Sequence, residues 1–171
     1  TLDFLRLLSR KEAEFIRGMA QYVVFDVNGG AYILKGKTTE ENKFDAIMML
    51  MELGLLGNLS SIGITAKKNG EESINFFLHH YGTGTFIITK QEKLSIHIYK
   101  LTSIGKEVFE LNDDVPLNIN YMRDFAENLV KGDPTMSVMC APILKILGND
   151  VDLDEEHAYI KLGTKYQKIE E

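Results

Sequence analysis

The sequence predicts an α+β fold in which three or four principal helices accompany a mainly antiparallel sheet. Residues 93–111 begin with the alternation of a strand and continue with the spacing of a helix. Residues 74–81 and 85–90 also have strand composition and are joined by a short turn. With residues 93–101 they form three consecutive strands, which predicts an antiparallel meander.

Length and composition are those of one globular domain. The chain has 171 residues, of which 44% are hydrophobic and 26% charged, and we expect residues 1–171 to form one α+β domain. Its first residue is Thr1 rather than methionine, which agrees with processing or with origin as a fragment of a longer protein. The formal net charge of −6 opposes a general role in binding phosphate backbones.

Cysteine content and the N-terminal residues indicate where the protein works. Cys140 is the only cysteine, so the chain forms no internal disulfide and a reducing cytoplasm is the expected location. Residues 1–8 are apolar, but Asp3 and Arg6 interrupt them and the stretch is too short to span a bilayer. We therefore predict no membrane partner.

The first predicted elements are a capped helix and a hairpin. Ser9 and Glu12 have the spacing of a capping box, which predicts a helix that runs to about Ala20. Residues 22–27 are β-branched and aromatic, and an Asn-Gly-Gly turn leads to a returning strand at residues 31–34. Helical spacing predicts four buried residues: Ala13, Ile16, Met19 and Ala20.

A second helix is expected to lie at the centre of the fold. Thr38 and Glu41 have capping-box spacing, and Gly54 is placed to end the helix as its C-terminal cap. Apolar residues cover most of the circumference, which predicts burial on several sides. Core packing is favoured over the alternative, an adaptable partner groove lined by methionine.

The strand–helix segment 93–111 is expected to position the elements around it. Thr102 is placed to cap the helix, and Gly105 lies in its first turn, where the absence of a side chain lets another backbone approach closely. We expect this segment and the second helix to share one core, composed of Phe44, Ile47, Met48, Met51, Ile96, Ile98, Ile104 and Val108.

The last third of the chain predicts a helix followed by strands. Apolar residues from Met122 to Leu129 mark an amphipathic helix that ends at Gly132. Residues 136–140 alternate like a strand, and Pro142 places that strand at an edge or ends it.

The acidic segment 150–156 allows two interpretations. Its aspartates alternate with Val151 and Leu153, as in a half-buried edge strand, or they bind a metal ion. A calcium-binding loop requires glycine at its sixth position and a carboxylate at its twelfth, where this chain has Glu155 and Lys161. We therefore favour the edge strand, with Asp150, Asp152 and Asp154 exposed.

Histidine and cysteine patterns predict no catalytic centre. His79 and His80 are adjacent in a strand, so they point to opposite faces, and His97 could approach only one of them. A catalytic zinc site commonly has three protein ligands. Cys140 has apolar neighbours in the sequence, which favours a buried, unreactive thiol. We predict no metal, no cofactor and no catalytic residue.

Two short motifs resemble those of known families. The segment LTSIGKEVFEL follows a β-ribbon and resembles the L-T-x-x-G pattern that follows the wing of winged-helix-like domains. The chain is also similar to poorly characterised bacterial proteins of unknown function. These resemblances imply a partly winged-helix-like fold and carry over no catalytic residue. The residues that carry them are Glu12, Ala13, Phe15, residues 52–56, Leu101, Thr102 and Gly105.

The patterns favour binding over catalysis. We expect a cytoplasmic bacterial interaction or regulatory module that binds a protein partner or associates with itself. The alternative is a winged-helix-like domain that binds nucleic acid, which the net charge disfavours. An enzyme is the third class, and the sequence argues against it without deciding. The nucleic-acid face of the alternative would consist of Lys67, Lys68, Lys90, Lys93 and Lys106.

Overall fold

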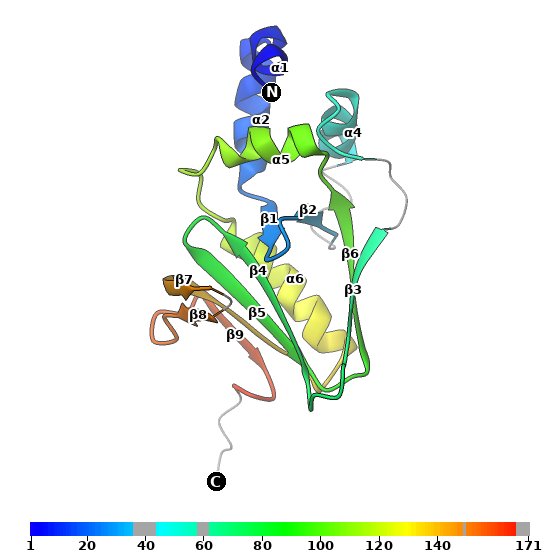
Figure 1. Cartoon of the computed structure of the whole chain (residues 1–171), viewed down its shortest axis with the longest axis vertical. Helices are drawn as coiled ribbons and strands as arrows, with labels where there is room; N and C mark the ends of the chain where they lie inside the picture. Colours follow the sequence, from blue (N-terminus) through cyan, green and yellow to red (C-terminus); the bar gives the residue numbers. More distant parts are fainter. Residues whose placement is uncertain (36–43, 58–61, 149, 167–171) are drawn as a thin grey trace.

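The computed structural model describes residues 1–35, 44–57, 62–148 and 150–166, and it confirms an α+β fold dominated by an antiparallel sheet (Figure 1). The helices are α1 (Leu2–Leu7), α2 (Arg10–Ala20), α4 (Phe44–Glu52), α5 (Ser103–Glu110) and α6 (Ile119–Gly132). The strands are β1 (Val23–Asp26), β2 (Ala31–Leu34), β3 (Ile62–Lys67), β4 (Ile74–His80), β5 (Thr83–Thr89), β6 (Lys93–Lys100), β7 (Ser137–Leu147), β8 (Asp150–Leu153) and β9 (Ile160–Gly163).

The strand order corrects the predicted meander. The sheet runs β3-β6-β2-β1-β4-β5-β7-β8, with β9 also paired to β7, and β3 contacts β4 because the sheet is curled. The predicted β1–β2 hairpin and the β4–β5 pair are confirmed. The meander is wrong after β5, because β6 pairs with β2 and β3. Instead β7 lies beside β5, where it contributes the buried run from Ser137 to Ala141.

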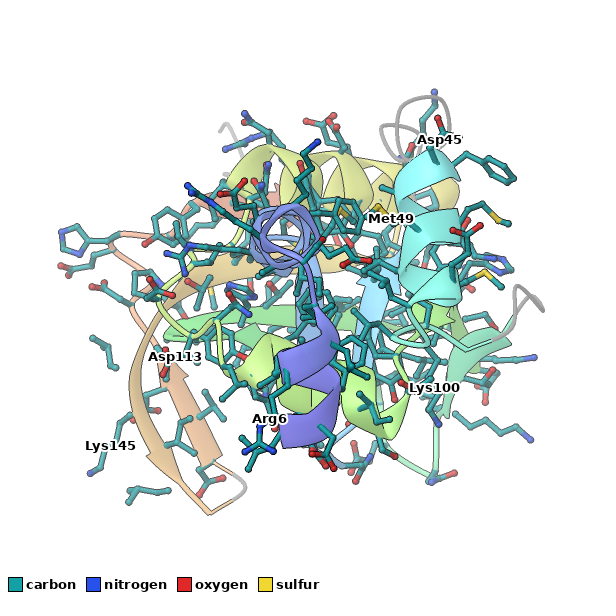
Figure 2. All side chains as sticks on the ribbon, turned by 90° about the horizontal axis from the view of Figure 1, so that it is seen from above. Arg6, Asp45, Met49, Lys100, Asp113 and Lys145 are labelled. Carbon is teal, nitrogen blue, oxygen red and sulfur yellow. The ribbon has the colours of Figure 1, made fainter. Side chains whose placement is uncertain are left out.

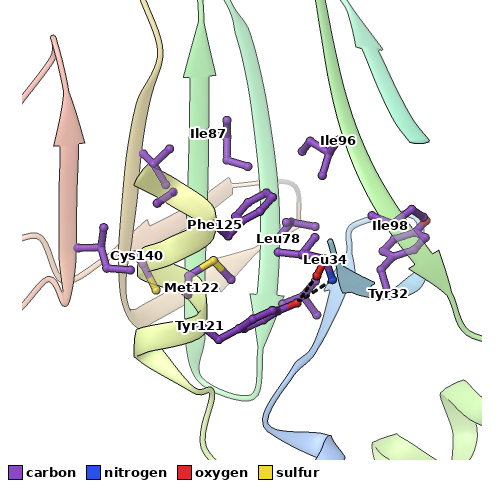
Figure 3. Packing of buried hydrophobic residues seen from close by; sticks show 14 of the residues in the cluster. Tyr32, Leu34, Leu78, Ile87, Ile96, Ile98, Tyr121, Met122, Phe125 and Cys140 are labelled. Carbon is purple, nitrogen blue, oxygen red and sulfur yellow. Dashed lines mark hydrogen bonds between the residues drawn. The ribbon is translucent and has the colours of Figure 1, made fainter. Parts of the chain in front are cut away.

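Helix α6 lies against the inner face of the curled sheet, where the buried side chains of both meet (Figure 3). Asn118 caps the helix by accepting a hydrogen bond from the Tyr121 amide at 3.0 Å. Met122 and Phe125 are buried, as the apolar spacing predicts, Leu129 is half-buried, and Tyr121 is buried as well. The Tyr121 hydroxyl accepts from the Leu34 amide at 2.7 Å and donates to the Leu34 carbonyl at 3.3 Å. These two bonds tie α6 to β2.

The C-terminal end of α6 is tied to β5 by a buried carboxylate. The Thr89 hydroxyl donates to one oxygen of Asp133, and the Thr135 amide and hydroxyl donate to the other at 2.9 and 2.8 Å. Burial alone would raise the pKa of Asp133, but these hydrogen bonds hold it below its ordinary value. The ionised form is therefore the one that stabilises this connection.

Helices α2, α4 and α5 cover the outer face of the sheet over β1 and β2, and we call this region the covered end. The capping box of Ser9 and Glu12 is present at the start of α2. The residues buried between helices and strands are Ile16, Met19, Ala20, Val23, Phe25, Ala31, Ile33, Ile47, Leu50, Val108 and Phe109.

The ends of α4 and α5 meet through backbone contacts. Gly54 has φ +72°, as expected for the glycine that ends a helix, and Thr102 donates to its carbonyl oxygen at 2.8 Å. The Thr102 hydroxyl also accepts from the Gly105 amide, so the predicted cap is confirmed. A Cβ atom on Gly105 would lie 2.1 Å from the Leu55 oxygen, which confirms the predicted close approach. A winged-helix arrangement is not shown by the described residues.

The predicted single core is wrong. Ile96 and Ile98 lie on the inner face, whereas Ile47 and Val108 lie on the outer face, so the sheet separates them. Ile104 is 43% exposed, because the side of α5 that carries Gly105 faces Leu55 and brings Val108 inward instead. On α2, the predicted burial of Ala13 is also wrong, because its side chain is exposed.

Helix α4 is less central than its composition predicts. It contributes Ile47 and Leu50 to the outer cluster, whereas Phe44 is 59% exposed, and Met48 and Met51 are half-buried. The helix lies at one end of the molecule, where only one of its sides meets the sheet (Figure 1). The predicted capping box of Thr38 and Glu41 lies outside the described residues.

Candidate functional site

The lysines predicted for a nucleic-acid face divide into two places. Lys67 and Lys93 lie opposite each other in the β3–β6 register. The Lys68 ammonium lies 3.8 Å from the Glu92 carboxylate. The negative charge of Glu92 partly offsets the attraction that Lys68 would exert on a phosphate. Grouped near this end of β3 and β6 are Lys67, Lys68, Lys90 and Lys93.

Lys106 is separate from the other four lysines. It lies on α5, and its ammonium is 3.7 Å from the Glu110 carboxylate. Figure 1 shows α5 at the opposite end of β6 from the β5–β6 turn. The structure therefore brings four of the five predicted residues together and leaves the fifth apart.

The three histidines considered as metal ligands do not converge. His79 and His80 lie on opposite faces of β4, as predicted, but β2 and β1 separate β6, which carries His97, from β4. His80 is fully buried, with Nδ1 2.6 Å from the Val23 oxygen and Nε2 2.7 Å from the Val115 oxygen. His80 therefore links β1, β4 and the α5–α6 connection. The prediction that His97 could approach His79 or His80 is wrong.

The remaining metal and nucleophile candidates occupy structural positions. Asp150 and Asp152 are exposed on β8, whose Leu153 is buried, so the edge-strand interpretation is confirmed, whereas Asp154 after the strand is half-buried rather than exposed. Burial raises the pKa of the Cys140 thiol. The part of the chain that the structure describes holds no group of three or more His, Cys, Asp or Glu side chains suited to a metal ion.

A polar cleft lies beside the β1–β2 turn. A cavity of about 340 Å³ is bordered by Asp26, Lys100, Ser103 and Lys106. One Asp26 oxygen accepts from the amides of Asn28 and Gly30, both at 2.8 Å, and the other accepts from the Tyr32 hydroxyl at 2.7 Å. Asp26 is thus committed to holding the turn, which leaves this cleft without a carboxylate free for acid–base work.

Beyond the covered end, the outer face of the sheet continues across β4, β5 and β7, and no described helix contributes to the apolar cluster there. We call this region, together with β8, the open end. Aromatic rings form a row towards it: the centroids of Phe25 and His79 are 5.6 Å apart, and those of Phe77 and Phe86 are 4.8 Å apart. Both pairs are register partners on neighbouring strands. Burial lowers the pKa of His79, which favours the neutral ring in this row.

The open end contains a cavity of about 340 Å³. Phe86, Ile88 and Met139 form its floor on β5 and β7, and Val151 and Leu153 of β8 form one side. Its polar lining consists of Asn75, Asp152, Glu155 and Lys165. The cavity is thus an apolar hollow with a polar rim, the composition typical of a binding site.

The hairpin of β7 and β8 extends from the open end as an arm, composed of residues 143–147 and 150–153. Figure 2 shows it projecting from the body of the molecule, with Lys145 labelled on it. Leu144, Ile146 and Leu147 are 66%, 59% and 58% exposed. This arm was not predicted from the sequence, although residues 143–147 are apolar except for Lys145 and precede a Gly-Asn pair, which is a hairpin signal.

The arm is acidic along its outer strand. Asp150 and Asp152 are exposed on β8 and form no ion pair within the described parts of the chain. Lys145 lies opposite Asp152 in the β7–β8 register without forming an ion pair with it. Asp154, just after the strand, is engaged differently, because His157 lies 2.9 Å from its carboxylate.

Comparisons with protein-family models, curated proteins and solved structures found no match. Within the described residues, no helix is both long and apolar enough to cross a membrane.

Proposed function

We propose that this chain is a cytoplasmic interaction module that acts by binding a protein partner, and that the open end and its arm form the binding surface. The observation that carries the proposal is the exposure of Leu144, Ile146 and Leu147 on one projection. Single exposed apolar residues are ordinary, but a group of them beside an apolar cavity is typical of an interaction site.

Binding rather than catalysis is supported by the engagement of the buried polar groups. Asp26 holds the β1–β2 turn, His80 links two carbonyl oxygens, and Asp133 joins α6 to β5. A general acid or base needs a titratable group directed at a substrate position. These three groups instead satisfy hydrogen bonds that the fold requires.

A photoreactive amino acid at position 147 tests the proposal in cells that produce the full chain. We expect a discrete covalent adduct that disappears when excess purified chain competes, because the competitor presents the same arm. The Leu144→Asp/Ile146→Asp variant should compete much less. Repeating the experiment with purified chain alone tests self-association, which would appear as an adduct of two chains.

The matched control places the photoreactive group at Leu7, which is 85% exposed on α1. It should give no adduct that the purified chain suppresses. Equal competition by the wild-type and double-variant chains would show that the arm is not the binding surface.

Nucleic-acid binding is the second candidate, and the grouping of Lys67, Lys90 and Lys93 supports it. Binding to duplex DNA should then weaken steeply as salt rises, and Lys67→Glu/Lys93→Glu should abolish it. Lys106→Glu is the control, because Lys106 belongs to α5, which lies at the other end of β6 from the group. We expect no duplex binding even at low salt, since the net charge of −6 repels the phosphates.

A further inference from the structure

Strand β8, which belongs to the open end, is the last strand in the order of the sheet. It pairs with β7 on one side, and no other strand of the described residues pairs with it. An unpaired strand edge presents backbone N–H and C=O groups, which can hydrogen-bond an added strand. Asp154, directly after β8, donates its amide to the Pro142 oxygen of β7 at 2.9 Å, so the pairing with β7 continues to the end of the strand.

The two faces of β8 differ in chemistry. Asp150 and Asp152 are exposed and lie on one face, where Asp152 also contributes to the polar rim of the cavity; Val151 and Leu153 lie on the other face and contribute to the apolar lining of the cavity. A strand added to this edge would place alternate side chains opposite the two aspartates and the others beside the cavity. The complementary strand therefore alternates basic and apolar residues.

We propose that β8 binds an extended segment of another protein, in which basic residues alternate with apolar ones, by addition of that segment as a further strand. This inference rests on the proposed function and specifies its partner. The charge complementarity comes from Asp150 and Asp152, which have no ion pair among the described residues. The apolar residues of the segment would cover Val151 and the adjoining cavity.

The same chemistry argues against β8 of a second copy as the occupant. Two copies of β8 that align their apolar faces must also align their acidic faces, so Asp150 and Asp152 would oppose aspartates of the other copy. Like charges directly opposite each other destabilise a strand pair. Charged side chains on edge strands are a common means of preventing such self-pairing.

Fluorescence anisotropy with a labelled peptide of about eight residues, alternating Lys and Val, tests the inference on the full chain. We expect saturable binding that weakens with salt. A peptide with Glu in place of Lys should bind at least about tenfold more weakly. A Lys–Val peptide that is N-methylated at every amide should not bind, because neither of its edges can then donate the hydrogen bonds of a strand ladder.

Variants of the protein test whether Asp150 and Asp152 act at their own positions or only through the net charge of the chain. Asp150→Asn/Asp152→Asn should weaken binding of the Lys–Val peptide about tenfold. Glu71→Gln/Glu72→Gln removes the same charge from the exposed residues between β3 and β4 and should leave binding unchanged. Equal loss in both double variants, or undiminished binding of the N-methylated peptide, would overturn strand addition at β8.

Two further outcomes are distinguishable. Failure of the Lys–Val peptide to bind, while the adduct at position 147 persists, would overturn this inference and leave the proposed function standing. Absence of both would remove the two together. Growth of the chain into larger assemblies with concentration, abolished by Lys67→Glu, would instead identify the β3 edge of a second copy, which carries Lys67, as the occupant and overturn the proposal.

Discussion

The covered end and the open end belong to the same face of one sheet, yet different elements pack over them. Ile33 on β2 and Ile88 on β5 are both isoleucines on strands of this face, but Ile33 is completely buried and Ile88 is only partly buried. The difference comes from the layer above. Helices α2, α4 and α5 cover the first region, whereas β8 and the residues around Tyr166 border the second.

This difference shows that side-chain alternation specifies which face of a strand is apolar, but not what will cover it. Apolar area that remains in contact with water contributes little to the stability of the fold, because that contribution scales with the area removed from water. Residues of the open end are therefore expected to matter less for folding than their composition suggests, and more for association.

The largest expected effect separates the two ends directly. Ile33→Ala should lower the free energy of unfolding by about 2–5 kcal/mol, because it leaves a cavity beneath the helices. Ile88→Ala, the matched change at the open end, should cost about 1 kcal/mol, since part of the side chain already meets solvent. Urea denaturation measures both values.

Equal losses for the two isoleucine variants would show that the open end is as well packed as the covered end. In that case the exposed arm would be a local feature, and the comparison between the two regions would fail.

A second test concerns how closely the helices of the covered end approach each other. Gly105→Ala should cost about 1–3 kcal/mol, because its Cβ would lie 2.1 Å from the Leu55 oxygen and the backbone must shift. Gly18→Ala on α2 is the control, since its Cβ would meet nothing within 4 Å. That control should be stabilising by up to about 1 kcal/mol. Thermal unfolding of both variants gives the comparison.

A third test asks whether the open end unfolds together with the rest. Asp133 connects β5 to α6, and its pKa is lower in the folded state than its ordinary value of about 3.9. Its contribution is therefore complete at neutral pH and is lost as the pH falls through the folded pKa. Asp133→Asn should cost about 1 kcal/mol at pH 7.

Chemical denaturation at pH 7 and near pH 3 checks this pH dependence. The difference between wild type and Asp133→Asn should shrink at the lower pH, with one unfolding transition at both. A difference that does not change with pH would show that the Asp133 carboxylate does not stabilise the connection of β5 to α6, and a separate early transition would show that the open end unfolds on its own.

The smallest expected effect on stability lies in the arm. Ile146→Ser and Leu147→Ser should change the free energy of unfolding by no more than about 0.5 kcal/mol, because both side chains are mostly exposed. Differential scanning calorimetry measures this. A loss comparable with that of Ile33→Ala would mean that the arm packs against the body in solution.

Local features of the fold were predictable because neighbouring residues determine them. The capping box of Ser9 and Glu12, the cap at Thr102 and the β1–β2 hairpin each depend on a few consecutive residues. The prediction of a close approach at Gly105 was also correct, since a glycine in the first turn of a helix allows another backbone to come near.

Long-range features were not predictable from these patterns. The short connection between β5 and β6 permits a hairpin but does not require one, and the competing strand β7 is distant in the sequence. The rotation of α5 depends on Leu55, which no periodicity within the helix reveals, so Ile104 was wrongly placed in the core. Helical spacing identifies an apolar stripe without identifying its partner.

The candidate site was recognised in part. Alternation from Asp150 to Leu153 correctly indicated an exposed acidic edge strand. Its importance depends on Phe86 and Met139, which lie on other strands and form the adjoining cavity only after folding. The arm itself has a sequence signal, the apolar run before the Gly-Asn turn, whose exposure cannot be read from composition.

The sheet also determines the order in which the chain is expected to fold. The pairs β1–β2, β4–β5 and β7–β8 join neighbouring strands, and isolated hairpins form in about 1–10 μs. Pairing of β2 with β6 brings Leu34 to Ile98 and must close a much longer loop, which slows folding. Hairpins should therefore form first and the curled sheet close last, with α6 enclosed as Tyr121 reaches Leu34.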